Sequence, residues 1–432
     1  MRIRREWLLA LCLLCCSPLC HILVAQAQLL DALFPEGVPG YGTEQGVTVE
    51  SRRRPEYEPL GIRIDTTTIR PMFGLSAGYD NNIFGGPSHR GAWQISAQPS
   101  VLASMENSLG STGLYLSAND VHYLGESTQN RTDASAFLGG TFYVGKDKLT
   151  LGAGYLAQHE DRTALDALPS DRPVAFAVAN FRASYDAVFG SLTATPALEV
   201  NHYQFDSTTI FGHPVGEAAR DRTSIQNGLT LRYGWMSGRD LLWVNRVVET
   251  RYTQPVTGQP SNNSNAWQSL FGVDYDDDTV WRYRLLGGVE YRQAAAGTTA
   301  SQTAGIAEAE VTWSPTGMTT LRASAFRGIE DAAQTGLSSY TYSTAQLRAD
   351  HELWRNVVLT ASATVRQATF DQTGGQQVGL GFDAGASWLI NRNLRLSLTY
   401  DFSDVRNAHL ATGTVAGDYT RNLTLLALRV AM

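Results

Sequence analysis

The chain lacks three features that would assign it to common protein classes. Its four cysteines all fall within residues 12–20, so a mature chain beginning beyond them has no disulfide bridge and no thiolate metal site. No apolar stretch after residue 30 reaches the 18 residues that a membrane-spanning helix needs. Only Lys146 and Lys148 are lysines, and charged residues make up 17% of the 432. These absences exclude a disulfide-framed domain, a thiolate zinc domain and a helical membrane protein.

The first 27 residues have the pattern of a secretory signal peptide. "MRIRREW" is basic, "LLALCLLCCSPLCHILV" is apolar, and "AQA" before Gln28 provides small residues for cleavage after Ala27. Removing this segment takes away three arginines and one glutamate, which leaves a net charge of about −9. An exported, mildly acidic chain of this kind is a poor nucleic-acid binder. We therefore expect no nucleic-acid partner.

From residue 68 onward, one kind of segment repeats. In "NLRLSLTYDF", Leu394, Leu396 and Leu398 alternate with polar residues, and a period of two predicts a strand with one apolar face. "FGLSAGYD" at 73–80 has the same pattern. Eighteen such strands are predicted, with starts near residues 68, 93, 112, 133, 148, 174, 190, 222, 240, 265, 280, 304, 318, 340, 356, 377, 393 and 418.

The connections between these strands alternate between short turns and long loops. "GKDK" at 145–148 and "INRN" at 390–393 are short, whereas the connections near residues 159–173 and 206–221 are long. Tight periplasmic turns and longer external loops are typical of outer-membrane barrels, whose sheet must close because lipid tolerates no open edge. Six of the eight tryptophans after the signal segment lie beside short turns, as in an interfacial aromatic girdle. The fold class predicted is an all-β, transmembrane, antiparallel up-and-down barrel of 16–18 strands.

Three parts of the chain follow from this interpretation. Residues 1–27 are the signal peptide, 28–66 a periplasmic N-terminal arm and 67–432 the barrel. The arm could be a disordered linker, a periplasmic tether or a partial plug of the lumen. Its arginine triplet, Arg52, Arg53 and Arg54, is the predicted docking feature for an acidic partner or for an acidic inner wall.

Assigning the apolar parity of each strand to lipid places charged residues of both signs in the lumen. They form either a structural ion-pair network or the polar wall of a conduit, and the two interpretations are compatible. If residues 315–317 form a three-residue turn, Arg322 lies opposite Glu310. The strand at 240–252 either exposes Arg246 or leaves Asn245 and Glu249 facing lipid, unless a bulge intervenes. The lumen-lining residues predicted are Arg182, Glu199, Arg232, Arg282, Arg284, Glu290, Glu308, Glu310, Arg322, Arg348, Asp350, Arg366, Asp383, Arg395 and Asp401.

Three acidic stretches are candidate catalytic or metal sites. His159–Asp161 begins a loop, and "DYDDDT" at 274–279 lacks the glycine and the closing glutamate of a calcium loop. Asp80–Asn82 follows the first strand, where turn chemistry explains an Asx residue. We expect no catalytic residue, no metal and no cofactor, and hence no enzyme.

Residues 52–84 carry a family resemblance. "RPEYEPLGIR" at 54–63, Pro71 and "GYDNNIF" at 78–84 resemble the entry segment of the family named putative β-barrel porin 2. The resemblance implies an outer-membrane barrel, and members of the family are often associated with exopolysaccharide or capsule systems. One departure is the end of the chain, which is Met432 where such barrels usually carry an aromatic residue. The alternation of Thr424, Leu426 and Leu428 still predicts a last strand.

The function expected from the resemblance is a polar conduit in the outer membrane of a Gram-negative bacterium. Its cargo would be an exopolysaccharide or capsule-type polymer, supplied by a periplasmic export partner. Alternatives are a general diffusion porin for small hydrophilic solutes, or a non-conducting barrel such as an adhesin, a scaffold or a lipid-active enzyme. Outer-membrane lipid is the one partner that all these hypotheses share, and the oligomeric state is left open.

Overall fold

The computed structural model describes residues 33–35, 37–41, 47–254, 262–276, 280–294, 301–333, 339–370, 373–409 and 417–432. Eighteen strands close into one antiparallel barrel. They are β2 (Thr67–Asp80), β3 (Ala92–Asn107), β4 (Gly110–Tyr123), β5 (Arg131–Val144), β6 (Asp147–His159), β7 (Ala175–Phe189), β8 (Leu192–Phe205), β11 (Arg222–Met236), β12 (Arg239–Tyr252), β13 (Ser264–Tyr275), β14 (Trp281–Ala294), β15 (Gln302–Thr316), β16 (Thr319–Asp331), β17 (Ser339–Trp354), β18 (Val357–Phe370), β19 (Gly375–Leu389), β20 (Leu394–Ala408) and β21 (Tyr419–Ala431).

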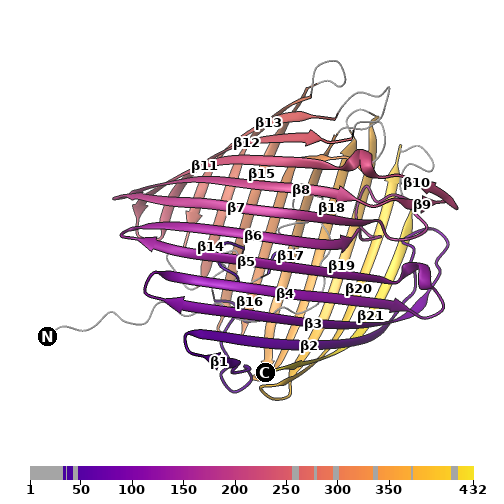
Figure 1. Cartoon of the computed structure of the whole chain (residues 1–432), viewed down its shortest axis with the longest axis horizontal. Coiled ribbons are helices and arrows are strands. Elements are labelled where there is room, and N and C mark those ends of the chain that lie inside the picture. The colour runs from indigo at the N-terminus through magenta and orange to yellow at the C-terminus, as the bar shows by residue number, and fades with distance from the viewer. Residues whose placement is uncertain are drawn as a thin grey trace.

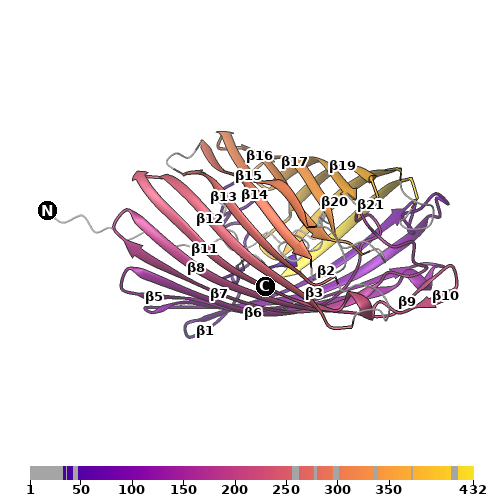
Figure 2. The same ribbon diagram turned by 90° about the horizontal axis from the view of Figure 1, so that it is seen from above.

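The predicted fold class is confirmed. Each strand begins within two residues of its predicted start, and β21 pairs back onto β2 to close the wall. In Figures 1 and 2 the strands on one side of the barrel run obliquely to those on the opposite side, as strand tilt in a barrel requires. No helix among the described residues is long and apolar enough to cross a membrane. The signal segment, residues 1–27, lies outside the described residues and stays a prediction.

Outer and inner faces of the wall alternate residue by residue. On β19, Val378, Leu380 and Phe382 are exposed on the outside, whereas Gln377 and Asp383 are buried. Large exposed apolar side chains recur at this parity around the barrel, as expected of a lipid-facing surface. The outer face also carries exposed tryptophans next to short turns, at positions 235, 281, 354 and 388.

Five short elements were not predicted. β1 (Ile62–Ile64) pairs with the first residues of β2. β9 (Thr208–Ile210) and β10 (His213–Val215) form a hairpin within the β8–β11 connection, at the end of the barrel where long connections gather (Figure 1). Two single 3-10 turns, η1 (Ser127–Gln129) and η2 (Ala218–Arg220), lie in loops on the same side.

The prediction that Arg322 lies opposite Glu310 is wrong. Glu310 pairs with Ser324, and Arg322 pairs with Thr312. The turn is tighter than three residues, because Thr316 pairs with Thr319 and the register shifts at a bulge after Trp313. A shift of two positions keeps every side chain on its predicted face while moving its cross-strand partner.

The ambiguous strand, β12, takes the register that leaves two polar residues outside. Its pairing with β13 is unbroken, so Asn245 and Glu249 share the outer face with exposed Trp243, and no bulge intervenes within this ladder. Ser269 Oγ donates to Asn245 Oδ1 at 3.1 Å, and Trp243 Nε1 donates to Ser269 at 3.1 Å. These bonds reduce the cost of placing an amide on the apolar face.

The Asp80–Asn82 turn closes the barrel. Arg421 of β21 donates through Nη2 to Asp80 Oδ2 at 2.7 Å, and this carboxylate is fully buried. The other oxygen of Asp80 accepts from the Asn82 amide at 2.9 Å, which is an Asx turn as predicted. Asn82 Nδ2 in turn donates to the carbonyl of Thr420 at 2.9 Å. The polar turn after the first strand therefore ties it to the last strand.

A candidate lumen site between two inserted segments

The connection from β6 to β7, residues 160–174 (the lumen loop), reaches the opposite wall. β6 and β7 are the fifth and sixth strands around the barrel, while β18 and β19 are the fifteenth and sixteenth. Leu165 packs in a buried cluster with Tyr340 and Phe370 of that far wall. The Asp166 amide donates to Gln377 Oε1 at 2.7 Å. The lumen loop therefore spans the interior of the barrel.

The ends of β16 and β17 meet the lumen loop. Ser339 to Tyr342 are buried at four consecutive positions, a pattern that a wall strand with one lipid-facing side cannot show. The amide of Ala333, just beyond β16, donates to Asp166 Oδ2. This end of the β16–β17 pair therefore bends into the barrel and packs on the lumen loop.

Ion pairs hold the lumen loop at its base. Glu160 bonds Arg220, whose guanidinium lies 4.1 Å from the centre of the Phe205 ring. Burial, together with the nearby Arg131, lowers the pKa of Arg162 to about 10. Burial alone would raise the pKa of Asp161, but Arg421, the Thr163 amide and Arg131 together hold it below its usual value. Both groups therefore stay charged at neutral pH.

The N-terminal arm lies inside the barrel along β4 to β8. Phe34, Val38 and Tyr41 are buried in one cluster with inward-facing residues such as Phe137. The Tyr41 hydroxyl donates to Asn180 Oδ1 at 2.9 Å, and burial raises its pKa so that it remains a neutral donor. Of the three alternatives for the arm, these contacts correspond to the partial plug.

The arm rests on a set of glycines from three neighbouring strands, which we call the glycine shelf: Gly113, Gly139, Gly152 and Gly154. A Cβ atom on Gly139 would lie 1.9 Å from the Pro39 carbonyl oxygen, far inside contact distance. At Gly152 it would lie 2.7 Å from the Tyr41 ring. Only glycine permits so close an approach of one backbone to another.

The arm enters at the end of the barrel with short turns, where three residues form what we call the clamp. Arg52 and Arg54 both bond the Glu352 carboxylate of β17, Arg54 at 2.9 Å. Arg52 also donates to the Gly317 carbonyl in the β15–β16 turn. Arg53 is exposed and makes no ion pair among the described residues. Two of the three predicted docking arginines thus share one carboxylate.

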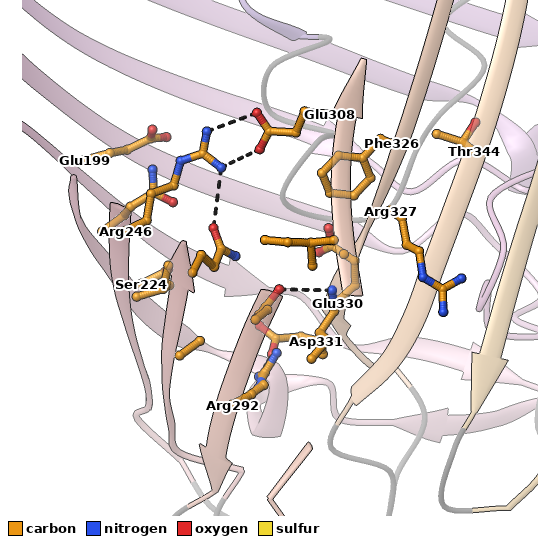
Figure 3. Close-up of a pocket in the computed structure, with 18 of the residues that line it drawn as sticks. Glu199, Ser224, Arg246, Arg292, Glu308, Phe326, Arg327, Glu330, Asp331 and Thr344 are labelled. Atoms are coloured by element: carbon orange, nitrogen blue, oxygen red, sulfur yellow. Dashed lines mark hydrogen bonds and ion pairs between the residues drawn. The ribbon is translucent and has the colours of Figure 1, made fainter. Parts of the chain in front are cut away.

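The inserted segments leave a cavity of about 530 Å³ in the lumen (Figure 3). Its lining is polar and carries both charges. Arg246 bonds Glu308 at 2.5 Å, Arg182 bonds Glu199 at 3.2 Å, and Arg222 bonds Asp331 at 3.1 Å. The first pair is drawn in Figure 3, with Arg292, a second partner of Asp331, below it. We call this space the charged cavity.

The predicted lumen residues fall into three groups. Five line the charged cavity: Arg182, Glu199, Glu290, Glu308 and Glu310. Three lie where the arm meets β16 and β17, namely Arg322, Arg348 and Asp350. Each of the two arginines bonds both Asp350 of β17 and Glu50 of the arm, at 2.8–3.0 Å. That any of these residues lines a conducting path stays a prediction.

The third group is spread along the remaining strands. Arg232 bonds Asp240 and Asp274, Arg282 bonds Asp276, and Asp383 accepts from Ser362 at 2.6 Å. Arg366 is fully buried, and Arg395 lines a small pocket beside Arg429. Arg284 pairs in register with Glu310, and Asp401 with Asp383. None of these residues joins the charged cavity.

Sequence reasoning left out several residues of the cavity. Arg246 belongs to the strand whose register was ambiguous, and Arg222 is the first residue of its strand, where periodicity is weakest. Asp331 contributes because the end of β16 bends inward, which no local pattern signals. In the His159–Asp161 stretch, which begins the lumen loop, His159 bonds Asp133 at 2.8 Å. The described residues contain no group of three His, Cys, Asp or Glu that could hold a metal.

Comparisons with known proteins complete the description. The family model described as Putative beta-barrel porin 2 matches residues 54–432. A search of curated proteins finds no match in sequence.

Several solved outer-membrane structures are similar to the chain. The outer membrane protein opdK from Pseudomonas aeruginosa is 12% identical with a TM-score of 0.45, covering 84% of this chain and 99% of its own. OccAB3 from Acinetobacter baumannii is 10% identical with a TM-score of 0.45, covering 85% and 100%. A BenF-like porin from Pseudomonas fluorescens Pf-5 is also 10% identical with a TM-score of 0.45, covering 85% of this chain and 100% of its own. The family match spans most of the chain, and it is this match, not the similarity to solved structures, that shows the family of the chain.

Proposed function

The chain belongs to the Putative beta-barrel porin 2 family, and on this premise we propose that it is a channel for passive diffusion of small hydrophilic solutes across the outer membrane of a Gram-negative bacterium. A cleaved signal peptide at residues 1–27 would deliver it there. The proposal takes up the diffusion-porin alternative from the sequence rather than polymer export. It includes no catalytic step.

The charged cavity is the observation that carries this proposal. At about 530 Å³ it has the size of a small-molecule site, for which about 300–1,000 Å³ is usual. An eighteen-stranded barrel with an empty lumen would hold a much wider water-filled channel. Here the arm and the lumen loop occupy part of that space, so the remaining path suits a solute of a few hundred daltons.

The chemistry of the cavity wall favours polar cargo of low charge. Arginines and carboxylates form pairs along the cavity wall, among them Arg246–Glu308 and Arg182–Glu199. Paired charges offer donors and acceptors to hydroxyl groups without a ring of one sign, which a strongly ion-selective pore would need. Sugars and small zwitterions are the solute class that such a wall accommodates.

Polymer export makes a different demand on the same lumen. A polysaccharide chain threads a continuous path from end to end, so both the arm and the lumen loop would have to leave the barrel. Leu165 is buried in an apolar cluster on the far wall and Tyr41 in another on the near wall. Displacing them would expose these clusters to water, which costs free energy.

The test is a size series. Refolded full-length protein is reconstituted into liposomes, and swelling is measured with neutral sugars from a pentose to a tetrasaccharide. The matched comparison is a chain without residues 28–46, which keeps the clamp. We expect the full chain to pass the smallest sugars and to exclude the tetrasaccharide, with a higher cut-off after deletion.

Two outcomes would count against diffusion of small solutes. Exclusion of every sugar by the full chain, with passage only after deletion, would make the arm a closed plug and favour a gated exporter. Exclusion by both chains, with the strand content verified by circular dichroism, would leave the non-conducting alternatives.

A further inference from the structure

The ladder between β15 and β16 ends early, at the pair Ala307–Arg327. β15 continues for five more residues, 302–306, and β16 for four, 328–331, without pairing to each other. The neighbouring ladders run to their ends: β14–β15 reaches Gln302, and β16–β17 reaches Asp331. The barrel wall is therefore split between β15 and β16 above Ala307.

The inward bend of β16 causes this split. Gly328, Ile329 and Glu330 are buried at consecutive positions, and the Ile329 amide donates at 3.4 Å to Glu290 Oε2 of β14, the next strand but one. Since β16 leaves the wall to join the lumen loop, the adjacent edge of β15 loses its partner strand. An unpaired edge within lipid is costly unless other groups bond its backbone.

Arg327 is the exposed charged side chain at the split, where Glu330 is buried and Asp331 bonds Arg222 and Arg292. Arg327 has the outer-face parity of exposed Ala325. Its Nε donates to the Gly305 carbonyl at 3.1 Å and its Nη1 to Ser343 Oγ at 3.0 Å. Among the described residues it has no carboxylate partner. In Figure 3 the Phe326 ring lies toward Glu308, whereas the Arg327 guanidinium points away from Glu308.

The depth of Arg327 places it near the outer membrane interface. Arg327 lies eight positions after the first residue of β16. On the nearby strand β14, the exposed aromatic residue Tyr291 lies at a similar height, ten positions after the first residue. A strand tilted by 45° rises about 2.3 Å per residue, so Arg327 lies about 19 Å above the short turns in an apolar band about 25 Å tall. Near the interface a lipid-facing arginine costs little, and its guanidinium lies at the level of the lipid head groups.

The surroundings of the split differ along its length. At the end of β15, Ser339 Oγ donates to Gln302 Oε1 at 2.9 Å and Gln302 Nε2 donates to Thr341 Oγ1 at 3.2 Å, whereas nearer Ala307 the residues are small or apolar. Gly305 is exposed, and a Cβ atom there would meet nothing within 4 Å. The charged cavity is lined on its inner side by Ile306 and Phe326, and also by Ala325 and Arg327 from the outer parity. The cavity thus reaches the wall where the ladder is open.

We propose that the split between β15 and β16 is a lateral binding site for an anionic single-chain amphiphile, whose head group bonds Arg327 and whose alkyl chain lies along Gly305 in the split. A guanidinium without a carboxylate matches an anionic head group, and a membrane-facing opening matches an alkyl chain. The proposal goes beyond sugar diffusion, and although Arg327 also lines the charged cavity, the binding assay below does not depend on permeation.

The test is binding of a fluorescent fatty acid, 11-(dansylamino)undecanoate, to the full chain in maltoside micelles. We expect saturable binding, displaced by dodecanoate and not by dodecyltrimethylammonium. Arg327→Gln should weaken it about tenfold, the usual scale for one charge-assisted hydrogen bond. Arg406→Gln is the matched control, because Arg406 is also exposed but pairs with Asp404 at 2.7 Å.

A second variant, Gly305→Phe, places a ring at the split while keeping the Arg327 side chain, and it should also weaken binding. Circular dichroism and the heat-dependent shift in gel migration establish that both variants fold. Absence of saturable binding, equal competition by the cationic amphiphile, or wild-type affinity in Arg327→Gln would each overturn the proposal. Full affinity in Gly305→Phe would overturn the placement of the alkyl chain.

Discussion

The inner wall of the barrel has two regions that differ in the size and charge of their side chains. Along β4 to β6 the wall carries the glycine shelf, and the arm lies directly on it. Along β7 to β16 the wall carries arginines and carboxylates, and the charged cavity lies against them. Where the wall is small and uncharged, the chain fills its own lumen; where it is charged, space for solute remains.

This difference has a physical cause. A backbone laid on glycine gains van der Waals contact without desolvating charged groups. A segment pressed onto the charged region would have to remove water from arginines and carboxylates, which costs more than the contact returns unless every charge is paired. The apolar part of the arm therefore lies on the shelf, and its charged part meets β16 and β17 where the charges are paired, as Glu50 is with Arg322 and Arg348.

The largest expected effect on conductance comes from replacing a glycine of the shelf with a large residue. Gly139→Leu places side-chain atoms where the Pro39 carbonyl now lies, so the arm cannot rest there. We expect single-channel conductance in planar bilayers to rise several-fold. Gly287→Leu is the control, because a Cβ atom there meets nothing within 4 Å. Equal conductance in both variants would show that the arm does not narrow the conducting path.

A smaller effect is expected from weakening the clamp while leaving the shelf intact. Glu352→Gln removes the carboxylate that Arg52 and Arg54 share. Leaving buried donors poorly paired costs about 1–3 kcal/mol, so the undocked population should rise roughly tenfold or more. Trypsin cleavage at Arg52 and Arg53 measures it.

The control for the clamp is Glu56→Gln. Glu56 lies 4.0 Å from Arg355 in an exposed pair, which contributes little to stability. Its cleavage rate should equal that of the wild type. If Glu352→Gln is cleaved no faster than Glu56→Gln, the shelf alone holds the arm.

In the charged region, a single change should alter selectivity more than conductance. Arg246→Gln leaves Glu308 without its arginine. A bare carboxylate attracts a cation at 4 Å by about 1 kcal/mol in water, which is roughly a fivefold bias in occupancy. The reversal potential in a KCl gradient should therefore shift toward cation selectivity. No shift would mean that ions do not pass the charged cavity.

The smallest expected effect is that of pH on the lumen loop. The pKa of Asp161 is lowered in the folded protein, so its stabilising contribution is complete above the unfolded value of about 3.9 and is lost as pH falls through the lower folded value. Conductance should stay constant from pH 8 to pH 5 and change only below about pH 4. A transition between pH 5 and pH 7 would assign gating to another group.

The sequence by itself determined the wall of this protein. Period-two alternation and turn chemistry are local signals, and they predicted all eighteen strands within two residues of their starts. They also predicted the Asx turn at Asp80, although not its bond to Arg421. Face assignment needs only parity, and Glu308 and Glu310, which parity assigns to the inner face, line the charged cavity.

Only the tertiary structure decided what fills the lumen. The lumen loop meets β18 and β19 across the barrel, the end of β16 bends inward to reach it, and Arg52 and Arg54 bond one carboxylate about 300 positions away in sequence. Such contacts depend on how an irregular segment packs against a distant surface, which no periodicity encodes. Cross-strand register is likewise set by turn geometry and bulges, which is why Arg322 was assigned the wrong partner.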